Sequence, residues 1–515
     1  MFKNIGSTWI LNLLQIAVVL VLSPFVLHRL GNEQNGVWVT IVSYTGILSL
    51  LILGVPMASV RFVAEQVAAK NVERMNAAIS TCLAICTGLG AAALVVGAVM
   101  WFVFDSQYLR GANAHPLPEG IANGASLAFA IVSLQVAFAF AMRLPYGIFD
   151  AHSDFVTRNV IMGGELFLRV ATTVALLMWN ASLPALAIVL VVSMLFEFTT
   201  ALALLKKRHP TVRFSFAAYD RSMARAILGF SIFALLLNVG TLLAFRVDAI
   251  VISSSLAPVH ATFFDVGNKF FDPLTGLVIS VGAVVMPLAT RLKTVGDLGA
   301  LRDVFLKWSK ICLSIVLLIG IYLFVAGPAF LAAWVGPEFE EPSGRVLQVL
   351  MLSFLAYLPV RGVALPILMG LGKPKAPAFA LLAMGVLNLI VSLALVHTLG
   401  IFGVALGTAI PNVLFALFVL TLACRELSVP VREYVGYVVV RASVGATIPA
   451  ALLWLFRAQI GLETWPKLIA AGILFVALFA VVWLAFVYRG DGHVDTAPLL
   501  RRFGIAGASG KKGAL

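Results

Sequence analysis

The sequence predicts an all-α polytopic membrane protein with about 14 transmembrane helices, arranged as two pseudo-symmetric six-helix bundles followed by two C-terminal helices. Composition is the first reason. Of the 515 residues, 61% are hydrophobic and 11% are charged, whereas soluble proteins carry about 25% charged residues. The mean hydropathy is +1.03, and apolar runs of transmembrane length recur from end to end. Such a chain cannot cover its surface against water, so a large soluble domain is excluded.

The apolar runs are separated by short segments rich in charged residues, proline and glycine. A helix needs about 20 apolar residues to cross about 30 Å of hydrocarbon. The first run follows Lys3, and Ser23-Pro24 is a poor signal-peptidase site, so this run is expected to remain as a transmembrane helix. The predicted spans are 5–27, 37–59, 77–104, 121–149, 160–179, 183–205, 226–252, 262–290, 306–329, 346–370, 377–397, 401–424, 434–457 and 466–488.

The 36 Lys and Arg residues orient these spans. With a cytoplasmic N-terminus, most of the basic residues fall on the cytoplasmic side, where they are retained, and these include Lys307 and Lys310 at the start of span 306–329. Those on the opposite side are Arg29, Arg110, Arg345, Arg457 and Lys467. Both termini are therefore expected in the cytoplasm. The net charge of +13 is explained by loops that meet anionic lipid headgroups, because no basic-aromatic module for nucleic acid is present.

A weak internal repeat divides the chain at the basic segment 206–225. The stretch LGNEQNGVW (30–38) aligns without gaps with LAPVHATFF (256–264), and each joins the first and second span of its half. Duplicated helical halves are the usual architecture of secondary transporters, with a binding site between the halves. The predicted regions are an N-terminal lobe (1–205), a cytoplasmic linker (206–225), a C-terminal lobe (226–424), two further transmembrane helices (425–488) and a cytoplasmic tail (489–515).

Proline and glycine residues within the spans predict bends and close contacts. Proline removes a backbone hydrogen bond and kinks a helix; such prolines are Pro56, Pro287, Pro359 and Pro366. The GxxxG pattern of Gly403 and Gly407 predicts close packing between helices.

Charged residues inside the spans are the main candidates for a binding site, because each is costly to place in a membrane without a partner or a wet cavity. Arg246 and Asp248 lie in span 226–252, and Asp265, Lys269 and Asp272 lie in span 262–290 at spacings of four and three, on one face of a continuous helix. Arg246 and Lys269 fall at a similar depth of about 10 Å. Two cations facing one cavity would bind an anion. The alternative is a structural network in which these charges neutralise one another.

Two other groups of charged residues carry weaker expectations. Glu165 and Arg169 form an i, i+4 pair that Glu197 could approach, and a structural role is expected for them. Arg361 lies deep in its span between two prolines and is a further candidate for substrate binding.

Metal, cofactor and enzyme chemistry are poorly supported. The four cysteines lie inside apolar runs, and no Cys and His residues have zinc-site spacing, so free thiols, no metal and no cofactor are expected. The string LMGLGKPK lacks the first glycine of an ATP-binding loop. The longest outer connection, near 105–120, is short for a catalytic domain. The sequence therefore predicts a transporter that is not an enzyme.

Several short motifs resemble the Wzx-like polysaccharide-transport flippases of the multidrug/oligosaccharidyl-lipid/polysaccharide exporter superfamily. They occur in the expected order over most of the chain: LGNEQNGVW (30–38), RVDAIVI (246–252), FFDVGNKF (263–270), GLGKPK (370–375), Asn388 and GIFGVALGT (400–408). The resemblance implies a multi-pass protein of the bacterial inner membrane. Such a protein moves a polyprenyl-pyrophosphate-linked oligosaccharide to the outer leaflet by alternating access, for O-antigen, capsule or exopolysaccharide synthesis, with polysaccharide polymerase machinery as a further partner.

The resemblance also implies roles for individual residues. Arg246 and Lys269 would meet phosphate or acidic sugar, and Asp248, Asp265 and Asp272 would position or balance them. Gating would fall to the kinked helices that contain Pro56 and Pro287. The related lipid II flippases carry basic residues in their first helix, whereas this chain has none in the middle of that span, which argues against lipid II as cargo.

Two other functions remain open at this level. A multidrug extruder of the same superfamily would need an excess of acidic residues in its cavity, whereas these spans carry mixed charge. A membrane-embedded glycan polymerase or transferase would need a sizeable outer loop with catalytic side chains.

Overall fold

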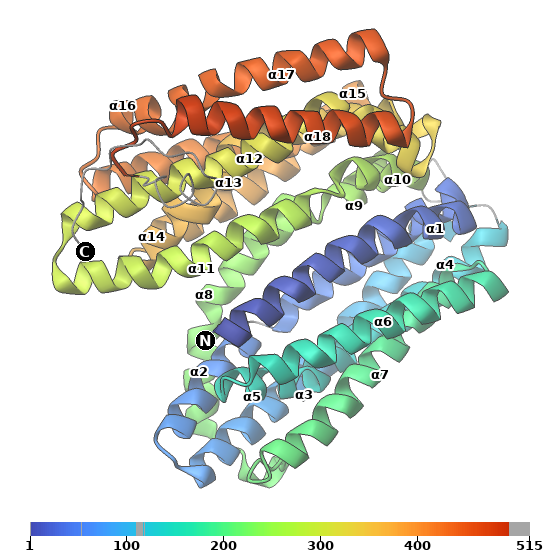
Figure 1. Ribbon diagram of the computed structural model, residues 1–515. Coiled ribbons are helices and arrows are strands. Elements are labelled where there is room, and N and C mark those ends of the chain that lie inside the picture. The colour runs from blue at the N-terminus through green and yellow to red at the C-terminus, as the bar shows by residue number, and fades with distance from the viewer. Residues whose placement is uncertain (1, 53, 110–116, 118, 494–515) are drawn as a thin grey trace. The chain divides into compact units, whose positions relative to one another are not determined.

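The computed structural model describes residues 2–52, 54–109, 117 and 119–493. Every regular element in this part of the chain is helical, which confirms the predicted all-α fold (Figure 1). Contacts between helices group the chain into two compact units. Unit 1 contains Met1–Asp265 and Leu389–Val404, and unit 2 contains Val266–Asn388 and Ala405–Leu515. The predicted lobe and linker boundaries stay a prediction. Most of the predicted outer loop near 105–120 and nearly all of the predicted C-terminal tail lie outside the described residues.

The helices of unit 1 come mainly from the first half of the chain. They are α1 (Phe2–Leu48), α2 (Val55–Ala68), α3 (Val72–Phe104), α4 (Glu119–Met142), α5 (Leu144–Ala151), α6 (Phe155–Trp179), α7 (Leu183–Arg208), α8 (Arg221–Phe245), α9 (Asp248–Ser255) and most of α10 (Pro258–Asn268). Within this unit α6 and α7 pack side by side, as Figure 1 shows.

Unit 2 contains the helices that follow. They are α11 (Phe271–Val295), α12 (Leu298–Val335), α13 (Pro342–Pro359), α14 (Leu365–Gly370), most of α15 (Lys375–Glu426), α16 (Val431–Tyr434), α17 (Arg441–Ile460) and α18 (Trp465–Val482). The pairings α2–α3, α3–α4 and α2–α5 of unit 1 recur here as α11–α12, α12–α13 and α11–α14. This recurrence supports the duplication predicted from the sequence. The additional helices α17 and α18 both pack on α12.

Eleven helical segments of the described chain are long and apolar enough to cross a membrane. Two of them, Ile10–Ile52 with 43 residues and Lys375–Glu426 with 52, far exceed the length of one crossing. Each contains a glycine with non-helical backbone angles, Gly31 (φ 77°) in α1 and Gly400 (φ 60°) in α15. A positive φ is accessible to glycine without steric cost. Each long segment therefore holds two predicted spans, and the number of spans is close to the predicted count.

Contacts between the two arms of α15 show that the chain turns back at Gly400. A Cβ atom on Gly403 would lie 2.4 Å from the carbonyl oxygen of Leu395, although residues eight apart in a straight helix are separated by about 12 Å. Further along, the Asn388 side-chain amide donates to the Thr408 hydroxyl at 2.9 Å. The prediction that Gly403 permits close packing is confirmed.

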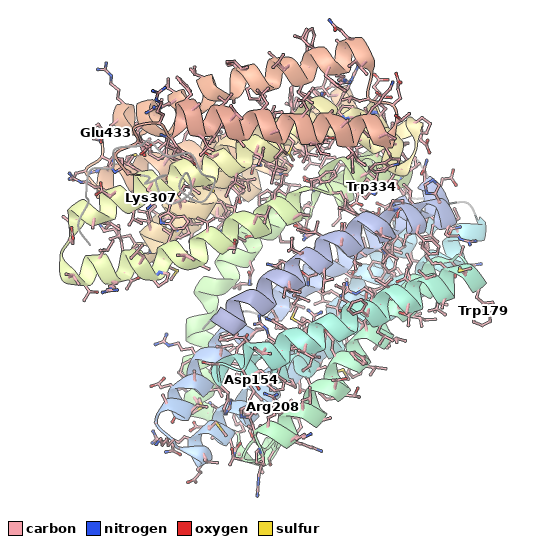
Figure 2. The ribbon with its side chains drawn as sticks, viewed as in Figure 1. Asp154, Trp179, Arg208, Lys307, Trp334 and Glu433 are labelled. Atoms are coloured by element: carbon pink, nitrogen blue, oxygen red, sulfur yellow. The ribbon has the colours of Figure 1, made fainter. Side chains whose placement is uncertain are left out.

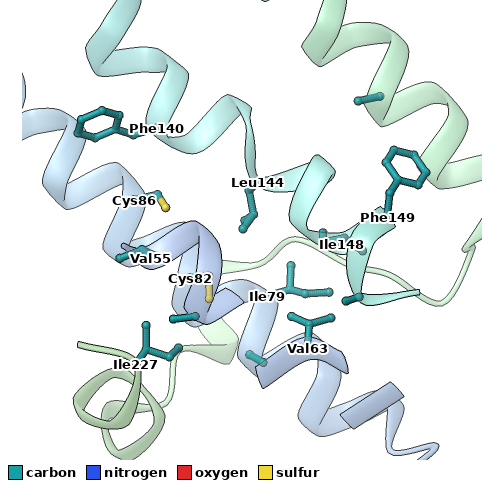
Figure 3. Close-up of a cluster of buried hydrophobic side chains, with 14 of the residues drawn as sticks. Val55, Val63, Ile79, Cys82, Cys86, Phe140, Leu144, Ile148, Phe149 and Ile227 are labelled. Atoms are coloured by element: carbon teal, nitrogen blue, oxygen red, sulfur yellow. The ribbon is translucent and has the colours of Figure 1, made fainter. Parts of the chain in front are cut away.

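The core of unit 1 includes a cluster of buried apolar side chains from all the helices from α2 to α8 (Figure 3). Because lipid is as apolar as these side chains, such a cluster is stabilised in a membrane mainly by close packing. The cluster includes two of the four cysteines, Cys82 and Cys86. All four cysteines are buried free thiols, as predicted.

The linker between α7 and α8 is held by the polar face of α3. The Asn76 side chain donates to the carbonyl oxygen of Thr211 and accepts from the backbone N–H of Arg213, both at 2.9 Å. Thr81 accepts from the backbone N–H of Asp220 at 3.0 Å. The Asp220 carboxylate then caps α8 by accepting from the backbone N–H of Ser222 at 2.7 Å. The linker thus has a fixed path along unit 1.

An ion pair joins the start of α6 to the end of α7 in unit 1. The carboxylate of Asp154 lies 3.1 Å from the Arg208 guanidinium and 3.7 Å from Nε2 of His209. The ring centre of His209 lies 4.1 Å from that of His152. Figure 2 shows Asp154 and Arg208 at one end of the unit and Trp179 at the opposite end of α6. Burial and the neighbouring His152 lower the pKa of His209. Burial acts to raise the pKa of Asp154, but hydrogen bonds from Thr157 and Arg208 lower it overall.

This group predicts a loss of stability in mild acid. The folded protein holds His209 at a pKa below its unfolded value of about 6.5, so protonation disfavours the fold as the pH falls below about 6.5. The Asp154 contribution is lost only at lower pH, below about 4, because its folded pKa is depressed. We expect the melting temperature of the purified protein to fall by about 1–3 °C between pH 7 and pH 5.5. His209→Gln should reduce this fall, and an equal fall in both proteins would contradict the assignment to His209.

Unit 2 contains a buried ion pair. Lys310 lies inside α12 with no exposed surface and pairs with the carboxylate of Asp491 beyond α18. The prediction that Lys310 lies on the cytoplasmic side stays a prediction. Asp491 also accepts from the Tyr437 hydroxyl and from the backbone N–H of His493. The Lys310 ammonium lies 4.3 Å from the centre of the Tyr437 ring. We call Lys310, Tyr437 and Asp491 the clasp, because they tie both additional helices to α12.

Candidate functional site: charged residues at breaks in membrane helices

The predicted span 226–252 is two helices, α8 and α9, with Arg246 at the break. The backbone N–H of Arg246 closes the end of α8 by donating to Leu242 at 2.8 Å, and α9 begins at Asp248. The Arg246 side chain is exposed, whereas Asp248 is 3% exposed. Interrupted helices in membrane transporters place backbone polar groups where they line binding sites. The break therefore strengthens the case for Arg246.

The predicted span 262–290 is also two helices, so the expectation of one continuous helix was wrong. α10 ends at Asn268, Lys269 lies in the turn, and α11 begins at Phe271 with Asp272 in its first turn. Pro273 follows at once, and proline is tolerated in the first turn of a helix. The turn at Lys269 and Phe270 separates Asp265 from Asp272, and the common face predicted for Asp265, Lys269 and Asp272 stays a prediction. Asp265 and Lys269 are partly exposed, and Asp272 is exposed.

Arg361 lies at a third irregular point, the π-helical turn Val360–Ala364 between α13 and α14. Such turns insert one residue into a helix and are frequent at functional sites. Close packing supports this turn: a Cβ atom on Gly362 would lie 3.1 Å from the carbonyl oxygen of Val278 in α11. The partly exposed Arg361 side chain is thus held by a turn that packs against α11.

The two proline residues predicted to act in gating occupy different settings. Pro56 lies in the first turn of α2, and Gly54, with a φ of 73°, directly precedes this helix. Pro287 lies inside α11. The helices continue past the predicted span ends at 59 and 290, as far as Ala68 and Val295. A role for either proline in gating stays a prediction.

Arg246, Asp248 and Asp265 belong to unit 1, whereas Lys269, Asp272 and Arg361 belong to unit 2. The cavity predicted between Arg246 and Lys269 therefore stays a prediction. Within the described residues, no group of three or more His, Cys, Asp or Glu side chains is arranged to hold a metal ion.

A second charged group lies in unit 1. Arg169 binds the Glu165 carboxylate with two hydrogen bonds of 2.7 Å, which confirms the predicted i, i+4 pair. Glu165 is 4% exposed. Glu197 of α7 lies within electrostatic range of this pair and of Arg143, and the Tyr146 hydroxyl is buried beside it. No sequence pattern points to Tyr146, because nothing in the sequence indicates that α5 brings it to α6 and α7.

The two stretches that align as an internal repeat contact each other. The Asn35 amide donates to the Thr262 hydroxyl at 3.4 Å, and the Thr262 hydroxyl donates to the carbonyl oxygen of Asn32 at 2.7 Å. The Thr40 hydroxyl donates to the carbonyl oxygen of Gly36 at 2.8 Å. The Ser253 hydroxyl lies 2.5 Å from that of Thr40. Asn35, Thr40, Ser253 and Thr262 are all buried. We call this contact of the second arm of α1 with α9 and α10 the seam.

The seam requires glycine at position 36. A Cβ atom there would lie 1.9 Å from the carbonyl oxygen of Pro258, which is backbone and cannot move aside as a side chain would. We expect Gly36→Ala to lower the melting temperature by several degrees, because the seam must open or shift. Gly46→Ala is the matched control, since a Cβ atom at Gly46 meets nothing within 4 Å on the same arm. Equal melting temperatures for the two variants would contradict this close contact.

The sequence matches a protein family model and a curated relative over most of its length. The family model described as "Polysaccharide biosynthesis protein" matches residues 1–293. The chain is 24% identical over 496 residues to the uncharacterized membrane protein EpsK of Bacillus subtilis (strain 168), covering 91% of this chain and 92% of EpsK.

Two solved structures share the fold. The lipid II flippase MurJ in an inward closed conformation aligns with a TM-score of 0.68 at 14% identity, covering 95% of this chain and 99% of MurJ. An inward-facing multidrug resistance MATE family transporter aligns with a TM-score of 0.64 at 14% identity, covering 81% and 98%. Because the family model matches more than half of the chain, this protein belongs to the polysaccharide biosynthesis protein family of membrane proteins.

Proposed function

We propose that this protein is a flippase that moves a polyprenyl-(pyro)phosphate-linked oligosaccharide across the bacterial inner membrane by alternating access. The glycan would serve O-antigen, capsule or exopolysaccharide synthesis. Membership of the polysaccharide biosynthesis family supports the substrate class. The MOP-type transporter fold shared with MurJ and the MATE transporter supports a transport role over an enzymatic one.

One observation carries the proposal: Arg246, Lys269 and Arg361 each lie at a break or π-helical turn in a membrane-spanning region. A pyrophosphate must lose water to enter a membrane cavity, and charge-assisted hydrogen bonds replace that water in a medium of low dielectric constant. Guanidinium and ammonium groups supply such bonds, whereas the polyprenyl tail can remain in lipid. Asp248, Asp265 and Asp272 would limit the net charge of the site so that the substrate can leave.

The seam is suited to act as the outer gate of this cycle. With a cytoplasmic N-terminus, the turn at Gly31 lies on the outer side of the membrane. The seam is polar and buried, so it can exchange its internal hydrogen bonds for water when it opens. An apolar contact of the same size would expose surface to water, which is unfavourable.

Removing the two central cations tests the substrate site. We expect Arg246→Ala and Lys269→Ala each to reduce glycan export by about tenfold or more, the effect of losing one charge-assisted hydrogen bond. Arg246→Lys should retain part of the activity, because the charge remains. Arg225→Ala, which removes an exposed arginine at the start of α8, is the control. Export is measured as lipid-linked glycan reaching the outer leaflet in cells that depend on this protein, with membrane levels matched by immunoblot. Normal export by the double alanine variant would overturn the site.

The MATE-like fold makes a multidrug extruder the second candidate. A deletion strain separates the two functions. Loss of drug resistance with unchanged surface glycan would favour the extruder, whereas loss of surface glycan with unchanged resistance would favour the flippase. Joining of sugar units by the purified protein in detergent would instead establish a polymerase or transferase.

A further inference from the structure

An apolar groove of about 480 Å³ runs between the two arms of α15 in unit 2. Both arms line it with apolar side chains, and three small ones, Ala376, Ala380 and Ala383, lie on the first arm. The other lining residues are large: Phe379, Met384, Leu387, Pro411, Leu414, Phe415 and Phe418. Leu414 and Phe418 are about half exposed, at 50% and 49%. The groove therefore opens to the outside of the helix pair.

The length of the groove matches one leaflet of a bilayer. Its first-arm lining begins at Ala376 and ends at Leu387, which corresponds to about 17 Å along a helix. Half of a hydrocarbon core of about 30 Å is about 15 Å. A single acyl chain of one leaflet would thus lie along the groove from the membrane surface to the midplane.

Basic side chains gather at the surface end of the groove. Lys375 directly precedes the first lining residue; it is exposed and makes no ion pair with any described residue. Lys373 pairs with Glu426, which ends the second arm. Lys293 donates to the carbonyl oxygen of Leu371 at 2.6 Å. Three lysines and one glutamate leave an excess of positive charge where a lipid headgroup would sit. Basic pockets at the ends of membrane helices bind anionic headgroups.

We propose that this groove is a binding site for one anionic phospholipid, with an acyl chain between the arms of α15 and the phosphate at Lys375. The groove selects a long apolar chain, and the excess of lysine selects a negative headgroup over a zwitterionic one. The site lies within unit 2 and is independent of the transport cycle proposed above. The site would hold one anionic phospholipid against this helix pair.

Native mass spectrometry of the full-length protein in detergent tests the site. Phosphatidylglycerol and phosphatidylethanolamine with the same acyl chains are added separately. We expect one phosphatidylglycerol per chain to be retained about fivefold more strongly than phosphatidylethanolamine, the effect of one lysine contact at a membrane surface. Lys375→Gln should abolish this preference, whereas Lys207→Gln, an exposed lysine of unit 1, should preserve it. Unchanged preference in Lys375→Gln would overturn the headgroup assignment.

Filling the groove tests the acyl-chain assignment. Ala383→Trp should remove the retained phosphatidylglycerol, whereas Val386→Trp, on the same arm but outside the lining, should not. A melting curve in detergent checks that both variants are folded. Equal retention by the two tryptophan variants would overturn the groove as the site. Two other results would also overturn the proposal: displacement of phosphatidylglycerol by equimolar polyprenyl phosphate, or a dimer that only Ala383→Trp disrupts.

Discussion

A disulfide between Thr40→Cys and Ser253→Cys is expected to stop glycan export completely, and a reducing agent is expected to restore it. The hydroxyl oxygens of these residues lie 2.5 Å apart across the seam. A disulfide bond is about 2.0 Å long, and two sulfur atoms at these positions can bond with little movement of the backbone. Because α1 and α9 would separate at the proposed outer gate, a covalent bond between them would hold the protein in one conformation.

This experiment requires a background without the four native cysteines, which are buried and are replaced with alanine. The two single cysteine variants, treated with the same oxidant, are the controls and should export normally. Normal export by the fully cross-linked protein would refute the gate but leave the flippase proposal standing. If the reduced double cysteine variant does not export glycan, the substitutions themselves disturb the seam. Glycan export by a double variant with Thr40→Ser and Ser253→Ala would then measure that disturbance.

Lys310→Met is expected to cost about 3–5 kcal/mol of stability, because it leaves a buried carboxylate without its cation. The side chains of Lys310 and Asp491 have no exposed surface. Burial acts to raise the pKa of Asp491, but hydrogen bonds from Lys310 and Tyr437 lower it overall. The stabilisation is therefore present above a pH of about 4 and is lost as the pH falls through the depressed pKa. Loss of the clasp should weaken the packing of α17 and α18 on α12, which other contacts such as the hydrogen bond from Tyr322 to Leu468 would still hold.

The double variant Lys310→Met with Asp491→Asn separates the buried charge from the packing. We expect it to be more stable than Lys310→Met alone, because no uncompensated charge remains. Arg345→Met is the control, since its ion pair with Glu341 is largely exposed and should contribute less than about 1 kcal/mol. Thermal melting in detergent measures all three. A Lys310→Met variant as stable as the control would show that the clasp contributes little.

Features set by hydrophobicity over a short stretch could be predicted from the sequence. The spans follow from the length of apolar runs, because a helix is the way a chain satisfies its backbone polar groups in lipid. The Glu165–Arg169 pair follows from a spacing of four within one helix, and the close packing at Gly403 follows from the absence of a side chain. In each case the relevant partner is nearby in the sequence.

The breaks at Arg246 and Lys269 were missed for a physical reason. Hydropathy does not change across a break, because the residues on both sides lie in the membrane and are apolar whether the helix is continuous or interrupted. Pro273, just after Lys269, was an available signal, since proline in a predicted span also fits the first turn of a new helix. No comparable signal precedes Arg246, and the π-helical turn at Arg361 was marked only by the prolines on either side.

The sequence by itself determined that this chain lies in the membrane and that it is helical, and it indicated a relation between the two halves that the recurring helix pairings support. Only the tertiary structure decided which polar residues meet: Asn35 with Thr262 at the seam, Tyr146 with Glu197, and Lys310 with Asp491. Burial of one residue depends on the free energy of transferring its own side chain from water, and this free energy can be estimated from the residue type. Pairing of two distant polar groups depends on the path of the whole chain between them, which no local pattern encodes.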